Sequence, residues 1–277
     1  MKKTMKALLL MLFAGAVTFT SCKKDDTGSV GGSGTTTVND ACRITQFSAT
    51  IFGMDQTSNF IYNASKQLVE ITSADGGKEK FTYNSSGLIS TVENYTNDTL
   101  TDYKSYTYNG TQFATETEYN VTDGVKGAVQ LISRYTYTAG KITRKDTYTV
   151  DPSTNEETMI NYTLFNTDAK SNITMSEQYS RNSDTTFTFS NSEKFTYGSD
   201  VSNKGLNWTF GSSIEFWNNT YLPLTNVTES YAGVGQPNDI TTTSFTFSNK
   251  NAKGFPATIN AVMGTLNVTA TATYTCP

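Results

Sequence analysis

Aromatic residues alternate with small polar residues along much of this chain, and this alternation restricts what it can fold into. Five short segments show it most clearly: Phe81-Thr82-Tyr83, Tyr106-Thr107-Tyr108, Tyr135-Thr136-Tyr137, Phe187-Thr188-Phe189 and Phe245-Thr246-Phe247. Successive side chains of a β-strand point to opposite faces, so the aromatic residues share one face and the threonines the other. Outside the first 21 residues, no segment sustains the spacing of an amphipathic helix. The sequence therefore predicts an all-β protein.

A repeated hairpin unit accounts for this pattern. Each unit has a strand ending in aromatic-x-Tyr, a tight turn of Asn, Gly or Ser, and a second strand that opens on an apolar residue. Clear copies cover residues 60–68, 81–89, 106–113 and 135–142, and weaker copies follow at 162–173, 195–197 and 245–255. This spacing fits one β-hairpin per unit. We expect a large antiparallel up-and-down sheet of about 16 strands, closed or nearly closed like a barrel, because so long a sheet must protect its edges.

The N-terminal residues have the pattern of a lipoprotein export signal. Lys2, Lys3 and Lys6 precede an apolar stretch over residues 7–17, and small Ser21 stands before Cys22. The apolar stretch is too short to span a bilayer, and a cysteine at this position is the expected acceptor of lipid. We therefore predict that Cys22 is lipidated and that the mature protein is anchored to the bacterial outer membrane.

The chain is predicted to have three parts. Residues 1–21 form the signal peptide, residues 22–39 form a flexible Gly/Ser/Thr-rich tether, and residues 40–277 form one all-β hairpin-repeat domain. The tether opens with Lys-Lys-Asp-Asp at residues 23–26, which resembles the surface-export signals of Bacteroidetes lipoproteins. This resemblance favours the cell surface over a periplasm-facing anchor, although a solvated linker often carries such charges.

Charge and composition exclude several classes of function. Cleavage after residue 21 leaves 18 basic and 25 acidic residues, a formal net charge of −7, which is unsuited to binding nucleic acid. The chain has no histidine, so the commonest metal ligand and general base are both missing. Glu116 and Glu118 share a strand, as paired catalytic carboxylates might, but such pairs usually face solvent. We expect no enzymatic activity and no cofactor or metal.

Two cysteines remain in the predicted domain, one near each end. Cys42 stands where the first strand is expected to begin, and Cys276 stands at the last strand. An oxidising envelope permits a disulfide between them, which would join the first and last strands, while the alternative is two unpaired thiols. Either way, their placement favours a closed sheet.

Several of these motifs are shared with a known family. The opening Cys42-Arg43-Ile44, the Tyr-turn-Leu hairpins and the closing Tyr274-Thr275-Cys276 resemble a Bacteroidetes lipoprotein family of unknown function with a porin-like fold. The hairpin at residues 81–88 also resembles the YD repeat of Rhs-type shells. The resemblance implies a barrel-like antiparallel sheet and brings no known activity. The strand faces rich in Thr, Ser, Lys and Glu, as at residues 115–118, disfavour a barrel that spans the membrane.

The segment over residues 207–223 interrupts the repeat and is the candidate binding site. It contains Trp208, Phe216, Trp217 and Tyr221 among asparagines. Exposed aromatic side chains beside amides are suited to stacking on sugar rings, while the alternative is that these residues pack in the barrel. We therefore expect non-enzymatic binding of a glycan or peptide. The alternative function is a structural or adhesion lipoprotein that acts through an envelope protein partner.

Overall fold

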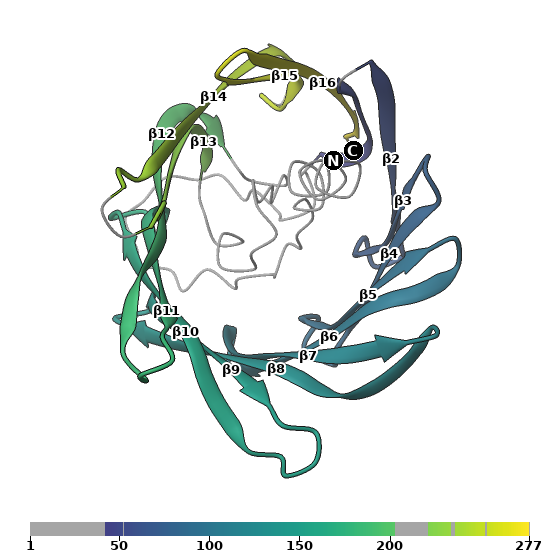
Figure 1. Cartoon of the computed structure of the whole chain (residues 1–277). Coiled ribbons are helices and arrows are strands. Elements are labelled where there is room, and N and C mark those ends of the chain that lie inside the picture. The colour runs from purple at the N-terminus through teal and green to yellow at the C-terminus, as the bar shows by residue number, and fades with distance from the viewer. Residues whose placement is uncertain (1–41, 52, 203–220, 234–235, 253, 277) are drawn as a thin grey trace, which may run out of the picture.

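The protein is a closed antiparallel β-barrel (Figure 1). The computed structural model describes residues 42–276 apart from 52, 203–220, 234–235 and 253, and it describes no side chains for 199–202 and 221–222. The described residues form sixteen strands: β1 (Arg43–Ile51), β2 (Met54–Tyr62), β3 (Leu68–Ser73), β4 (Gly77–Tyr83), β5 (Ile89–Thr96), β6 (Thr99–Asn109), β7 (Gln112–Thr122), β8 (Val125–Thr138), β9 (Lys141–Val150), β10 (Glu157–Thr167), β11 (Ile173–Arg181), β12 (Phe187–Ser202), β13 (Tyr221–Ser230), β14 (Asp239–Lys250), β15 (Pro256–Met263) and β16 (Leu266–Thr275).

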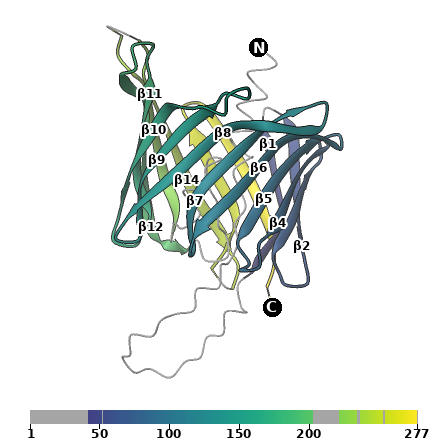
Figure 2. The same ribbon diagram turned by 90° about the horizontal axis from the view of Figure 1, so that it is seen from below.

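The strands follow one another around the barrel in chain order. Each strand pairs antiparallel with its neighbours in sequence, and β1 pairs with β16 to close the ring. Figure 2 shows the strands inclined to the barrel axis, as closure of a sheet requires. The predicted all-β, up-and-down, barrel-like fold is thus confirmed, including its closure and the number of strands.

The two faces of the sheet differ in burial. In β16, Val268, Ala270 and Ala272 are buried, while the intervening Thr269, Thr271 and Thr273 are exposed. Side chains on the concave face of a barrel converge and those on its convex face diverge, so the buried set faces the interior. The largest cluster of buried apolar residues lies on the inner face of β1–β5, β15 and β16, and a smaller one centres on Ile142, Phe165, Ile173 and Phe195.

A β-bulge recurs where each repeat meets its turn. The strand register shifts between Thr82 and Tyr83, and comparable shifts occur at Tyr62, Tyr108, Tyr137 and Tyr197. A bulge inserts one residue in the partner strand and increases its local twist. The repeated motif therefore encodes a hairpin with a bulge at one end of the barrel.

At five places around this end of the barrel, a tyrosine hydroxyl donates to a backbone carbonyl of the preceding strand. We call this set the tyrosine ladder: Tyr62 donates to Ile44 O (2.9 Å), Tyr83 to Leu68 O (2.6 Å), Tyr108 to Ile89 O (2.8 Å), Tyr197 to Ile173 O (2.6 Å) and Tyr274 to Pro256 O (2.7 Å). Burial raises the pKa of Tyr62 to about 12, with Arg43 opposing the shift, so this hydroxyl stays a donor. The tyrosines of this ladder are therefore structural residues of the barrel end.

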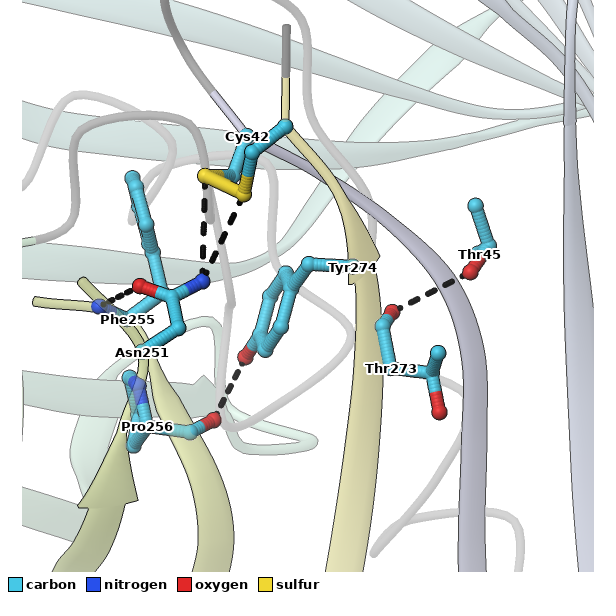
Figure 3. Close-up of a disulfide and its surroundings, with 8 residues drawn as sticks. Cys42, Thr45, Asn251, Phe255, Pro256, Thr273 and Tyr274 are labelled. Carbon is cyan, nitrogen blue, oxygen red and sulfur yellow. Dashed lines mark hydrogen bonds between the residues drawn. A yellow bond between two sulfur atoms is a disulfide. The ribbon is translucent and has the colours of Figure 1, made fainter. Parts of the chain in front are cut away.

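A disulfide between Cys42 and Cys276 joins β1 to β16 (Figure 3). The two sulfur atoms are 2.00 Å apart. The side-chain amide of Asn251 donates to both sulfurs, at 3.7 Å from Cys42 Sγ and 3.5 Å from Cys276 Sγ, while its oxygen accepts the backbone N–H of Phe255. The disulfide occupies the place where a turn would otherwise connect the last strand to the first.

Candidate functional site

A group of charged side chains lies on the inner face of β4, β6 and β7, and we call it the inner charged wall. It consists of Glu79, Asp102, Lys104, Glu116 and Glu118. The strand register places them together, because Lys104 pairs with Glu118, and the next inward residue, Tyr106, pairs with Glu116. On the other side, Asn94 of β5 pairs with both Glu79 and Asp102. Four carboxylates therefore surround one ammonium group.

Lys104 is the centre of the wall. Its Nζ lies 3.5 Å from Glu118, 3.9 Å from Glu116 and 4.0 Å from Asp102. Burial lowers the pKa of Lys104, but the three carboxylates outweigh burial and the net shift is upward. Only 26 % of this side chain is exposed, so the ammonium group is held charged in a poorly hydrated position.

Polar side chains around the wall fix its carboxylates. Asn94 donates to Asp102 Oδ2 at 3.2 Å, and the Tyr135 hydroxyl donates to Glu116 Oε2 at 3.4 Å. Next to Glu116, Ser133 and Thr147 are buried and their hydroxyls lie 3.2 Å apart. The wall is therefore ordered by its neighbours before any ligand binds.

Glu79 has a strongly perturbed carboxyl group. Burial raises its pKa from 4.5 to about 7, Lys104 opposes this shift, and Asp102 adds to it. A carboxyl group with this pKa exchanges its proton near neutral pH. The formal charge of the wall therefore changes between −2 and −3 in that range.

The barrel does not require charge on its inner face. The corresponding face of β15, β16 and β1 carries Ile259, Val268, Ala270, Ala272 and Ala49, all of them buried. The same architecture thus accepts aliphatic side chains at equivalent positions, where a desolvated charge would be costly. This contrast identifies the wall as a candidate functional site.

Aromatic and cationic side chains form a second unusual surface, which lies on the outer face of β4–β12, the blue-to-green part of the ring in Figure 1. We call it the tyrosine–cation band, and all eight of its rings are partly exposed. Its members are Tyr95, Tyr103, Tyr119, Tyr148, Tyr162, Tyr179, Phe187 and Phe189, with Lys80, Lys126, Arg134 and Arg144.

Cations lie over the tyrosine rings along this band. Lys126 Nζ is 4.0 Å from the ring centre of Tyr103 and 3.8 Å from that of Tyr119. Arg144 lies 4.3 Å from the Tyr162 ring, which stacks on Tyr179 at 4.9 Å. Similar contacts join Lys80 to Tyr95 and Arg134 to Tyr148. The aromatic and cation–π contacts of the band thus form four separate groups along these strands.

The site residues predicted from the sequence belong to neither of these two surfaces, apart from Glu116 and Glu118. Cys22, Trp208, Phe216 and Trp217 lie outside the described residues, and Tyr221 begins β13 without a described side chain. Cys42 and Cys276 lie at the seam between β1 and β16.

Two expectations about strand faces were wrong. Glu116 and Glu118 face the barrel interior, because the bulge after Phe113 shifts the alternation of β7 by one residue. The sequence of residues 115–118 predicted that these two glutamates would belong to a polar strand face opposite the aromatic one. The bulge instead places them on the same inner face as Phe113. Aromatic residues also lie on both faces, since Tyr103 and Tyr119 point outward. Counting Tyr and Phe separately at the odd and the even positions of each strand could have revealed the band.

The described residues contain no group of three or more Cys, Asp or Glu arranged to hold a metal ion. Among the same residues, no helix has the length and hydropathy needed to cross a membrane.

The fold and site define a class of protein: a closed antiparallel barrel with charged side chains on part of its inner face. No protein-family model and no curated protein matches the chain. Among solved structures, it is similar in fold to a porin-like protein from Bacteroides vulgatus, with a TM-score of 0.55 and 9 % identity over 84 % of this chain and 99 % of that one. This likeness confirms the porin-like fold that the sequence motifs implied.

Two further solved structures overlap less closely. A porin-like protein from Bacteroides uniformis has a TM-score of 0.33 at 12 % identity, covering 84 % of this chain and 98 % of that one. A protein of unknown function from Bacteroides fragilis has a TM-score of 0.35 at 12 % identity, covering 50 % of this chain and 86 % of that one.

Proposed function

We propose that this is a non-enzymatic, lipid-anchored binding protein of the bacterial cell envelope, exposed at the cell surface. Its ligand carries amino groups, as a basic peptide does, and binds at the inner charged wall. The observation that carries this proposal is the cluster of carboxylates around Lys104, three of them within 4.0 Å of its ammonium group, whereas the inner face of β15, β16 and β1 is aliphatic. A fold would not need these desolvated charges, whereas a cationic ligand would neutralise their excess.

Binding fits the wall better than catalysis does. Glu116 and Glu118 both lie within 4 Å of Lys104, so both carboxylates already have an ammonium group as their ionic partner. The absence of histidine from the chain supports the same view.

The anchor is tested at Cys22. Cys22→Ser is expected to abolish lipid attachment, so that the protein leaves the membrane fraction or stays unprocessed. Detergent phase partitioning of both proteins, with labelling by a radioactive fatty acid, provides the measurement. Unchanged partitioning and labelling would refute lipidation at this cysteine.

The ligand class is tested with tri-lysine as the probe. Calorimetric titration of the mature domain should show binding of tri-lysine and none of tri-alanine, with an affinity that falls as salt is added. Replacing two carboxylates in Glu116→Gln/Glu118→Gln should weaken tri-lysine binding at least tenfold, or about 1.4 kcal/mol.

The matched control is Glu156→Gln/Asp184→Asn, which makes the same chemical change at two exposed turn residues. It should leave the affinity unchanged. Circular dichroism of each variant verifies folding. Equal affinity of the wall variant and the control variant, or no binding of tri-lysine at all, contradicts the proposal.

A further inference from the structure

We propose that the tyrosine–cation band is a second binding surface, which holds an uncharged polysaccharide on the outside of the barrel. This site is separate from the inner charged wall, because the band lies on the opposite face of the same strands. Tyr103, for example, stands between Asp102 and Lys104 and points outward.

Neighbouring strands of the barrel can pair without aromatic residues on the outer face. Elsewhere on this face, threonine pairs across neighbouring strands with hydroxyls in hydrogen-bond contact, as in Thr107–Thr115 and Thr196–Thr225, both at 2.6 Å. The band replaces this pattern with eight partly exposed rings on neighbouring strands. A concentration of partly exposed aromatic surface on one side of a protein is characteristic of a binding surface.

The charges of the band indicate an uncharged ligand. Arg134 Nη1 lies 2.6 Å from Glu157 and Arg144 Nε lies 2.7 Å from Asp146. Lys80 pairs across the strands with Glu93, and Glu177 lies beside Tyr179. Lys80, Arg134 and Arg144 therefore each have a carboxylate beside them, which compensates most of the positive charge of the stacked cations. A polyanion would meet these carboxylates and a polycation would meet the cations, so the complementary partner is neutral.

The same groups suit the chemistry of a sugar chain. Guanidinium and ammonium groups donate hydrogen bonds to hydroxyls, and the ring surfaces contact the apolar C–H faces of sugar rings. Stacking already fixes Tyr162, Tyr179 and Arg144, so little side-chain freedom is lost on binding. The band crosses the strands on a convex surface, so an extended polymer can follow it from strand to strand at a spacing of about 4.8 Å.

Affinity electrophoresis tests this inference. The mature domain is run through gels containing one of three neutral polymers (soluble starch, mixed-linkage β-glucan or galactomannan) or the polyanion polygalacturonate. We expect retardation by at least one neutral polymer and none by polygalacturonate. Tyr103→Thr/Tyr119→Thr and Tyr162→Thr/Tyr179→Thr, which restore the residue typical of the outer face, should weaken that retardation at least tenfold.

The matched control is Thr246→Ala/Thr271→Ala, two exposed outer-face changes on β14 and β16. It should migrate like the unchanged protein, and so should Glu116→Gln/Glu118→Gln, which keeps this test independent of the inner wall. If a tyrosine variant does not fold, Lys126→Ala/Arg144→Ala removes only the stacked cations and should also weaken retardation.

Three results would overturn the proposal. The first is no retardation by any neutral polymer, and the second is retardation that the band variants leave unchanged. The third is a dimer in sedimentation velocity that the tyrosine variants dissociate, which would assign the band to a second copy of the chain.

Discussion

Glu79 carries a carboxyl group that faces the barrel interior, where the fold alone would favour an apolar side chain. Its neighbours along β4 are Phe81, which is buried in the core, and Lys80, which stacks on an outer tyrosine. The inward position costs the carboxylate its hydration, and the nearby Lys104 compensates only part of that loss. A residue with such an environment makes the stability of the barrel depend on pH.

The direction of this dependence follows from the raised pKa of Glu79. Between about pH 4.5 and 7 the folded state binds more protons than the unfolded state, so stability falls as pH rises through this range. The full shift corresponds to an upper limit of about 3 kcal/mol, and solvent access inside the barrel should reduce it to about 1–2 kcal/mol.

Glu79→Gln should therefore raise the free energy of unfolding at pH 8 by about 1–2 kcal/mol and change it little at pH 4. Urea denaturation at the two pH values measures this difference. Glu156→Gln, at an exposed turn position, should show no such change. If Glu79→Gln and Glu156→Gln have the same pH profile, the carboxyl group of Glu79 is not the origin of the dependence.

At the scale of the element, the hairpin repeat explains which features of the strands were predictable. Alternation and turn residues locate strands well, because each is a local property of a few neighbouring residues. The turn at Asn84 illustrates this, since its side-chain oxygen accepts the N–H groups of Ser86 and Leu88 at 3.0 Å. The repeat therefore predicted both the strands and their order.

The bulges explain what could not be predicted about the elements. A bulge depends on the register between two strands rather than on the sequence of one strand. No sequence pattern within β7 therefore predicts that Glu116 faces inward. A single inserted residue reverses every later side chain of the strand. The inner charged wall was missed for this reason, while the motif residues beside the turns were placed correctly.

At the scale of the whole molecule, closure was predictable because the edges of a sixteen-stranded sheet demand it. From the positions of the two cysteines, the sequence favoured a disulfide, with two free thiols as the alternative. The structure pairs them over a separation of 234 residues. Loops of this length gain the most from a cross-link in the chain-entropy description.

Cys42→Ala/Cys276→Ala should lower the free energy of unfolding by about 3–5 kcal/mol. Guanidinium denaturation followed by circular dichroism measures the loss. A reducing agent should destabilise the unchanged protein by a similar amount and leave the double variant unaffected. Coincident denaturation curves for all four samples would contradict this expectation.

The seam disulfide also has a mechanical consequence. The strands, their turns and the bond from Cys42 to Cys276 together form one covalent ring, and the segment before Cys42 is attached to that ring at the junction of β1 and β16. A force applied to this segment is therefore carried by β1 and β16 together, so neither strand can separate from the barrel alone. Mechanical unfolding would then require the hydrogen bonds of both strands to break at the same time.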